Sequence, residues 1–231
     1  MIKNETFKSA FKAAFPHTIP VLTGFLVLGA AYGVLMLKSG YSALWSVMMS
    51  ALAFCGSMQF LAITLLTTVF DPIQAFLLSL MVNARHLFYG LAMLNRYKGM
   101  GRARAFLIYT LCDETFSIVS SIDTPEGVDK KQFYLSISLL NYIYWVSGTL
   151  IGGILGNFIS FSTRGLDFAL TALFVVLFIE QVKKKENRVS GLIGILAAAL
   201  GLTLFGARNM VIPSMAFIMI ILMAGREKLC C

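Results

Sequence analysis

The sequence predicts an all-α integral membrane protein built as a polytopic helical bundle. Of its 231 residues, 58% are hydrophobic and only 13% are charged, and the mean hydropathy is +0.81. A soluble domain of this length carries roughly twice that share of charge. The apolar residues form long runs, not the short alternating segments of about ten residues that are typical of a β-barrel. We therefore expect a single transmembrane domain over residues 1–231.

The net charge of +8 lies in short basic blocks between the apolar runs. Membrane topology produces this distribution, because Lys and Arg stay on the cytoplasmic side, so we expect no nucleic-acid partner. The two histidines, His17 and His86, are too far apart in sequence to indicate a metal site. No phosphate loop or nucleotide motif occurs either. The expectation is a protein without cofactor or metal, and not an ATP-driven pump by itself.

The N-terminal segment, residues 1–17, carries Phe at every fourth position and Lys on other faces. This pattern predicts an amphipathic helix in the membrane interface, and Pro16 is expected to end it. The first membrane span then covers residues 18–37. It contains Gly29 and Gly33, a spacing that allows another helix to approach closely.

Two longer apolar runs, 43–70 and 153–181, are interrupted near the middle by small or polar residues. The run 43–70 is long for one crossing. It forms either one tilted helix or two half-helices that meet at Gly56 and Ser57. If both runs are hairpins that enter and leave on one side, every basic block becomes cytoplasmic. The loop 123–132 then becomes external.

Each half of the chain would then contain a crossing, a broken hairpin and two further crossings, with 105–122 as a single span. An odd number of crossings inverts the second half relative to the first. The sequence thus predicts two inverted-topology repeats, 18–122 and 133–225, with both termini cytoplasmic. Secondary transporters commonly have this architecture and hold their substrate near the midplane between broken helices.

The span 71–94 carries Asn83, Arg85 and His86 near its middle. Polar side chains at that depth are costly and are usually functional. Arg85 would need a carboxylate partner, from the protein or from a substrate. The alternative is that the helix ends near Tyr89 and leaves the guanidinium at the membrane interface.

A helical rotation of 100° per residue divides this span into two sides. Asn83, His86 and Gly90 lie within about 60° of one another, whereas the opposite arc is filled by apolar residues such as Leu80 and Phe88. One side therefore suits lipid or packed core, and the other side suits a polar site.

Asp113 and Glu114 are the expected carboxylate partners. Because they are adjacent in a predicted helix, at most one of them should face Arg85. A buried carboxylate without a cation tends to take up a proton. Asp113, Glu114 and His86 are therefore the proton-coupling candidates, and a static ion pair with Arg85 is the alternative interpretation.

A helix that starts at a break exposes backbone N–H groups that favour an anion, although a glycine kink in an ordinary helix would explain the same residues. The substrate-binding candidates are Gly56, Ser57, Gln59, Asn83, Arg85, His86 and Asp167.

Four stretches resemble the AzlC family, the large subunit of bacterial branched-chain amino acid transport systems: GFLVLGAAYGVL (24–35), FCGSMQFLAITLL (54–66), VNARHLFYGL (82–91) and LDFALTALFVVL (166–177). The resemblance implies export of branched-chain or related amino acids across the bacterial cytoplasmic membrane. It also implies a small hydrophobic membrane subunit of the AzlD type as partner. It does not imply a settled binding site.

Together, the residues and the resemblance predict a secondary transporter, not an enzyme, that works by alternating access and is coupled to the proton gradient. The substrate carboxylate would meet Arg85 and the break at 56–57, and its ammonium would meet one of the acidic candidates. Phe60, Phe88 or Phe168 would line the side-chain pocket. A channel and an intramembrane acid–base enzyme that uses His86 are the alternatives.

Overall fold

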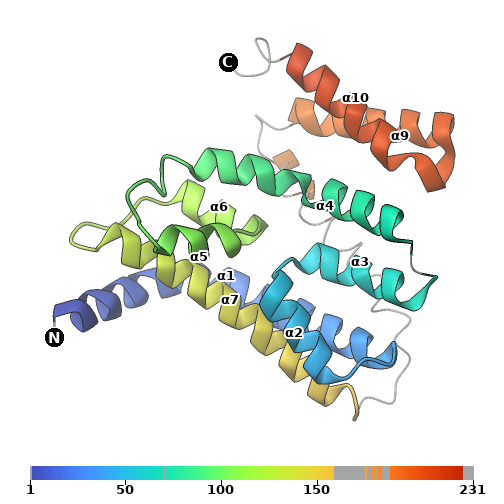
Figure 1. The fold of residues 1–231 in the computed structure, drawn as a ribbon. Helices are drawn as coiled ribbons and strands as arrows, with labels where there is room; N and C mark the ends of the chain where they lie inside the picture. Colours follow the sequence, from blue (N-terminus) through green and yellow to red (C-terminus); the bar gives the residue numbers. More distant parts are fainter. Residues whose placement is uncertain are drawn as a thin grey trace. The chain divides into compact units, whose positions relative to one another are not determined.

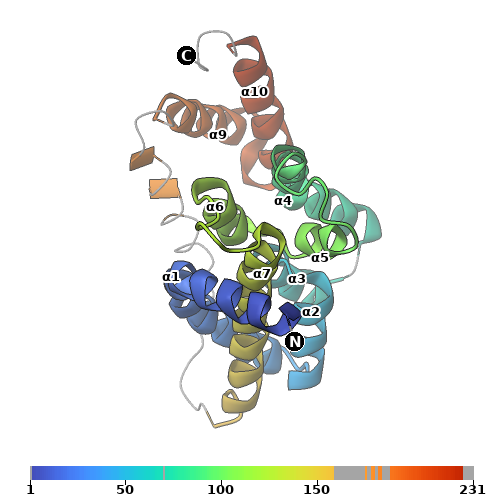
Figure 2. The same cartoon turned by 90° about the vertical axis from the view of Figure 1, so that its left-hand side faces the viewer.

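The computed structural model describes residues 2–69, 71–158, 175, 178–179, 182–183 and 188–225. Among these residues all regular structure is helical and no strand occurs. The chain divides into two compact units, residues 1–166 and 167–231, and each is described by itself (Figures 1 and 2). Four of the described helices are long and apolar enough to cross a membrane, which agrees with the expected all-α membrane class.

Two long helices, α1 (Ile2–Lys38) and α7 (Lys130–Leu155), lie against each other along their length in the first unit (Figure 1). Their backbones touch. A Cβ atom at Gly29 would lie 2.9 Å from the carbonyl oxygen of Trp145, and one at Gly33 would overlap the backbone of Thr149. The close approach expected from this glycine spacing is therefore confirmed, and α7 is the helix that uses it.

The expected end of the first helix at Pro16 is wrong, because α1 continues through Pro16 and Pro20. Proline removes a backbone donor, but packing and side-chain hydroxyls can compensate inside a helical bundle. The Thr18 hydroxyl donates to the carbonyl of Phe15 at 2.9 Å and lies 3.1 Å from the hydroxyl of Tyr144 on α7. Thr18 is fully buried. Contact with α7 thus keeps the helix continuous across its prolines.

The run 43–70 contains two half-helices, which was one of the two expected arrangements. α2 (Ala43–Ala53) ends at Phe54, whose φ of 41° is left-handed, and α3 (Gly56–Thr67) begins two residues later. The hydroxyl of Tyr41 donates to the carbonyl of Leu66 at 3.1 Å. The segment before α2 and the last turn of α3 are therefore neighbours, so α3 ends close to where α2 begins.

The span expected over 105–122 is also broken, which corrects the prediction of a single crossing. After α4 (Pro72–Met93), the chain forms α5 (Ala103–Tyr109) and α6 (Asp113–Ser121). The two acidic residues stand in the first turn of α6. Acidic side chains stabilise that end of a helix, where unpaired N–H groups carry positive partial charge.

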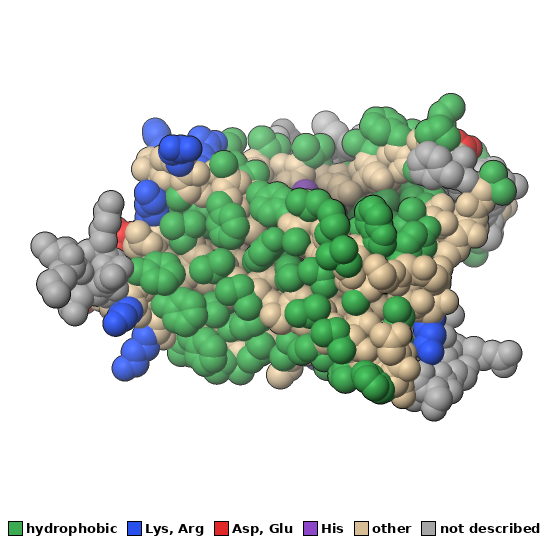
Figure 3. All heavy atoms as spheres, turned by 60° about the horizontal axis from the view of Figure 1, so that its bottom comes forward, with side chains coloured by type: hydrophobic (Ala, Val, Ile, Leu, Met, Phe, Trp, Pro, Cys, Tyr) green, Lys and Arg blue, Asp and Glu red, His purple; other side chains and the backbone are tan. Residues whose placement is uncertain are grey.

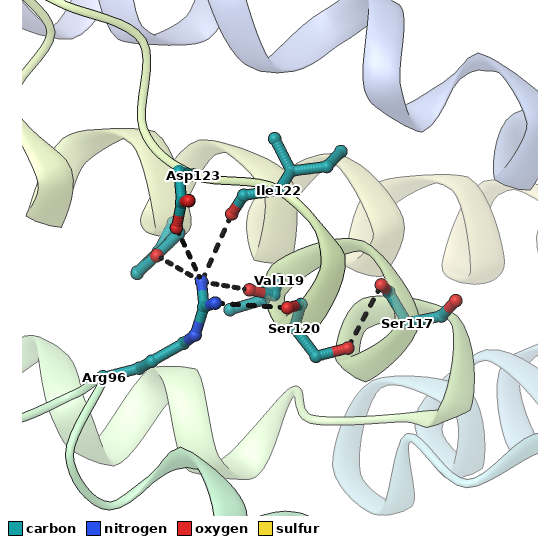
Figure 4. A network of polar contacts seen from close by, with 7 residues as sticks. Arg96, Ser117, Val119, Ser120, Ile122 and Asp123 are labelled. Carbon is teal, nitrogen blue, oxygen red and sulfur yellow. Dashed lines mark hydrogen bonds and ion pairs between the residues drawn. The ribbon is translucent and has the colours of Figure 1, made fainter. Parts of the chain in front are cut away.

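Arg96, which follows α4, binds the other end of α6 (Figure 4). Its Nη1 donates to the carbonyls of Val119 at 2.8 Å and Ile122 at 3.2 Å, and its Nη2 donates to the carbonyl of Ser120 at 3.1 Å. Nη1 also lies 3.6 Å from the carboxylate of Asp123. A cation suits the C-terminus of a helix, where the last carbonyls lack partners. The end of α6 is thereby fastened beside the end of α4.

Helices α1 and α7 run in the same direction, whereas the expected inverted repeats would make them antiparallel. The ring of His17 lies 6.1 Å from that of Phe133 near the start of α7, and Gly33 meets Gly152 near its end. The expectation of inversion for these two helices is wrong, because it counted 105–122 as one crossing. The residues after α4 and the loop 123–132 lie at one end of the unit, not at opposite ends. The break expected at 162–165 in the second repeat lies outside the described residues.

The second unit contains α9 (Arg188–Asn209) and α10 (Val211–Ala224), which match the two final spans expected from the sequence. Gly206 interrupts the helical backbone near the end of α9 with a φ of 70°. The two helices touch closely, since a Cβ atom at Gly201 would lie 3.0 Å from the carbonyl oxygen of Met210.

The surface of the protein is rich in apolar side chains. On the face in Figure 3, hydrophobic side chains cover the middle, and Lys and Arg side chains lie toward the margins. Large hydrophobic residues are exposed on several helices, among them Leu44, Phe76, Leu150 and Leu192. An apolar surface of this extent suits hydrocarbon better than water.

Candidate functional site

Arg85 lies in the middle of α4 and joins the two helix breaks of the first unit. Its Nη1 lies 3.0 Å from the carboxylate of Asp113 at the start of α6, and its Nη2 donates to the Ser57 hydroxyl at 2.8 Å in the first turn of α3. Both members of the ion pair are largely buried, with side-chain exposures of 31% and 21%. α4 continues to Met93, so the interpretation that the helix ends near Tyr89 is wrong.

Tyr89 holds the same carboxylate from the next turn of α4. Its hydroxyl donates to Asp113 at 2.7 Å, and its ring stacks on that of Phe116 with the centroids 4.4 Å apart. Asp113 thus receives a cation on one oxygen and a hydroxyl on the other. The expectation that one of the two adjacent acids would face Arg85 is confirmed for Asp113. Glu114 stands beside it in the first turn of α6.

Asn83 faces the other break. The Cys55 thiol donates to the amide oxygen of Asn83 at 2.8 Å and lies 3.9 Å from the Ser57 hydroxyl. Cys55 is the residue immediately before α3. The contact between Cys55 and Asn83 was not predicted from the sequence. The only signal in the sequence was its position next to Gly56-Ser57.

A cavity of about 330 Å³ opens where α4 meets both breaks. α4 contributes Asn83, His86, Leu87 and Gly90, and this agrees with the polar side predicted from the helical rotation. The remaining lining residues come from the ends of α2 and α5 and the residues after them: Ala53, Phe54, Cys55, Ile108, Tyr109 and Leu111. Two interrupted helices and one polar strip therefore line one partly open cavity.

Gln59 does not reach this cavity. Its side chain is almost fully buried, donates to the Ser50 hydroxyl and accepts from the indole N–H of Trp145, each at 2.8 Å. Ser50 in turn lies 2.8 Å from the hydroxyl of Thr149. The structure thus places Gln59 in a polar network that binds α2 and α3 to α7. A buried amide with both ends satisfied stabilises packing.

Gly56 also lies against α7. A Cβ atom there would lie 2.9 Å from the ring of Trp145, so the absence of a side chain lets the indole pack on the start of α3. Trp145 is nearly fully buried, so its ring serves in packing.

Two of the three aromatic residues expected to line a side-chain pocket, Phe60 and Phe88, do not line the cavity. Phe60 is buried and packs edge-on against Tyr32 of α1, with the ring centroids 5.7 Å apart, and Phe88 is 64% exposed on the opposite side of α4. The aromatic side chains that line the cavity are Phe54 and Tyr109, beside several aliphatic ones. Asp167 and Phe168 lie outside the described residues.

Two tyrosines that sequence reasoning did not connect to the site meet at the end of α2. The hydroxyls of Tyr109 and Tyr142 both donate to the carbonyl of Ala51, which is one of the last carbonyls of α2. Tyr109 also lines the cavity. Hydrogen bonds thereby connect the end of α2 to both α5 and α7. These bonds fix the position of the first break relative to the second. No sequence spacing relates these residues, because they come from three separate segments.

Comparison with known proteins places this architecture in a family. The family model described as AzlC protein matches residues 20–159. The chain belongs to the AzlC family. It is 46% identical over 229 residues to the Branched-chain amino acid transport protein AzlC of Bacillus subtilis, covering 99% of this chain and 90% of that protein. No solved structure matches the chain significantly.

The chain is also similar to membrane proteins of other bacteria. An Uncharacterized membrane protein of Helicobacter pylori is 40% identical over 97% of this chain and 99% of its own length. The Inner membrane protein YgaZ of Escherichia coli is 24% identical over 85% of this chain and 83% of its own length. Membership and the apolar helices together make this AzlC-family chain a membrane protein. Among the described residues, no group of three or more His, Cys, Asp or Glu side chains could hold a metal ion.

Proposed function

We propose that this AzlC-family protein is the permease subunit of a secondary transporter that exports branched-chain or related amino acids across the bacterial cytoplasmic membrane. The observation that carries the proposal is the cavity between two interrupted helices, with the Arg85–Asp113 ion pair beside it. Broken helices around a midplane site are a recurrent feature of secondary transporters. The name of the Bacillus subtilis relative, a branched-chain amino acid transport protein, supplies the substrate class.

The charges of the ion pair complement those of an amino acid. A substrate carboxylate would bind the Arg85 guanidinium, and a substrate ammonium would bind Asp113. The two charged groups of a zwitterion would thus take the place of the ion pair between Arg85 and Asp113. The start of α3 at Gly56 and Ser57 adds N–H groups that favour the carboxylate, and Asn83 and His86 add polar atoms from the cavity wall. Asp167, which lies outside the described residues, stays in the proposal as a candidate for binding the substrate ammonium, whereas Gln59 serves packing.

Alternating access follows if substrate binding changes the contacts that Arg85 makes with the two breaks. The α2–α3 pair and the α5–α6 pair would act as two re-entrant gates on either side of α4, supported by the contact between Tyr41 and Leu66 and by the Arg96 bonds to the end of α6. A substrate that binds Arg85 in place of Ser57 and Asp113 would loosen one gate from the other. A ligand can shift such an equilibrium only by its difference in affinity between the two states.

Coupling to the proton gradient forms a separate part of the proposal. Once a substrate ammonium leaves and Arg85 is engaged elsewhere, Asp113 would be a buried carboxylate without a cation, which favours protonation. Glu114 and His86 are the other carriers proposed. Efflux driven by an imposed pH gradient in proteoliposomes, and absent when both sides have the same pH, would support coupling. Equal efflux under both conditions would contradict coupling to the proton gradient.

A small hydrophobic AzlD-type subunit is the proposed partner, and both are proposed to lie in the cytoplasmic membrane with the termini cytoplasmic. Co-purification of tagged protein with that subunit from membranes, compared with an unrelated membrane protein of similar size, tests the partnership.

The transport proposal is tested with Arg85→Ala. Efflux of radiolabelled leucine or valine should fall by an order of magnitude or more at equal membrane abundance, since Arg85 touches both breaks. Arg104→Ala removes an exposed arginine and is the matched control, for which efflux should be unchanged. Wild-type efflux in Arg85→Ala would end the proposal. A channel would instead give conductance without amino acid, and an intramembrane acid–base enzyme would give a chemically altered product.

A further inference from the structure

We propose that the 330 Å³ cavity is the subsite for the aliphatic side chain of the substrate, and that Gly90 sets the length of side chain it accepts. This inference rests on the proposed transport function. It assigns a size-selecting position to α4, on the same side of the helix as Asn83 and His86.

The lining of the cavity is divided by chemistry. Asn83 and His86 form its polar part, one to two turns before Gly90 on the same side of α4. The residues from the two breaks are mostly apolar, and two of them, Phe54 and Leu111, are themselves buried, with exposures of 6% and 5%. A volume near 330 Å³ is at the lower end of the range for ligand pockets, about 300–1,000 Å³. The space suits one small ligand with an apolar end.

Gly90 differs from the packing glycines of the first unit. At Gly29, Gly33 and Gly56 an added Cβ would meet α7 at contact distance or closer, so close packing explains those residues. At Gly90 an added Cβ would meet nothing within 4 Å. Glycine in a helix interior is less favourable than alanine because it loses more backbone freedom on folding. Packing does not require a glycine here, and the space it leaves belongs to the cavity that it lines.

Filling that space should therefore exclude long side chains first. A side chain at position 90 would project from α4 beside Asn83 and His86 and shorten the cavity, and its Cβ atom would meet no neighbour within 4 Å. One methylene group in an apolar pocket changes discrimination by about 10-fold or more. Leucine and valine differ by one methylene and form the sensitive pair.

The experiment measures efflux of radiolabelled leucine and valine from proteoliposomes for Gly90→Ala and Gly90→Val. The ratio of leucine to valine efflux should fall about 10-fold in Gly90→Val, with a smaller fall in Gly90→Ala. Gly24→Val is the matched control, because Gly24 is also helical and has open space around its Cβ but does not line the cavity. Its ratio should match that of the wild type.

A second variant tests the same cavity by enlargement. Ile108→Ala removes a half-exposed lining residue and should raise methionine efflux relative to leucine several-fold, a gain that misfolding cannot produce. Wild-type ratios in both Gly90→Val and Ile108→Ala, or equal loss of leucine and valine in Gly90→Ala and Gly90→Val, would overturn the inference. Failure of the transport proposal looks different, because the wild-type protein would then carry neither amino acid.

Discussion

The guanidinium of Arg85 lies 3.0 Å from the carboxylate of Asp113, and this ion pair joins the middle of α4 to the first turn of α6. The same guanidinium reaches the Ser57 hydroxyl in α3. One side chain thus connects both helix breaks of the first unit. Replacing Arg85 should lower both the stability of the protein and the rate of transport, and the two effects can be separated by experiment.

The first prediction concerns the energy of this pair. Arg85→Ala and Asp113→Ala should each lower the free energy of unfolding by about 1–3 kcal/mol, because each leaves one largely buried charge without its partner. The double variant should lose less than the sum of the two single losses. Unfolding in mixed detergent micelles measures all three. Additive losses would show that the two residues act independently.

The second prediction concerns the hydrogen bond from Tyr89. Tyr89→Phe removes one donor from Asp113 and keeps the stacked ring, so stability should fall by about 1 kcal/mol and leucine efflux should fall with it. Tyr144→Phe removes the hydroxyl next to Thr18 in the α1–α7 contact and serves as control. It should cost similar stability but leave efflux intact. Equal efflux in both variants would contradict a role for Tyr89 in holding Asp113.

The third prediction concerns Arg96 at the end of α6. Arg96→Gln should destabilise the protein by about 2–3 kcal/mol, because a charged donor to several helix carbonyls is replaced by a shorter neutral side chain. The exposed Arg102→Gln is the control and should stay within about 0.5 kcal/mol of the wild type. Thermal unfolding in detergent gives the comparison. An unchanged midpoint for Arg96→Gln would mean that the α6 end is held by its flanking residues alone.

The fourth prediction concerns the contact between α1 and α7. Gly33→Ala should lower the free energy of unfolding by about 1–3 kcal/mol, because its methyl group would overlap the backbone of α7 and force the helices apart. Gly24→Ala adds the same methyl group to α1 where nothing lies within 4 Å. That variant should be neutral or slightly more stable, since alanine favours helix over glycine. The difference in unfolding midpoint between the two variants is the measurement.

The fifth prediction concerns membrane topology. Because Arg96 binds the end of α6, single cysteines in a cysteine-free background at Lys98→Cys and Glu126→Cys should react from the same side of the membrane. Lys38→Cys, at the far end of α1, should react from the opposite side. Labelling of intact cells and of inverted vesicles with an impermeant thiol reagent tells the sides apart. Reaction of positions 98 and 126 from opposite sides would restore the single crossing over 105–122.

Much of the fold could be predicted because it depends on local composition. The all-α membrane class follows from the long apolar runs, and the break near Gly56 follows from small polar residues in a run too long for one crossing. The strip of Asn83, His86 and Gly90 follows from helical periodicity alone. In these cases the residues that define the feature are neighbours in sequence or on one helix.

The tertiary structure alone decided the features that depend on side chains from distant segments. The break before Asp113 follows an apolar stretch without glycine or proline, and Arg96 stabilises the resulting helix end from another loop. The chain turns back at that break, and α7 runs parallel to α1. Gln59 was assigned to the site by its neighbours in sequence, yet Ser50 and Trp145 saturate its amide. Hydropathy reports where a segment prefers to lie, whereas direction and contact depend on partners that only the folded chain brings together.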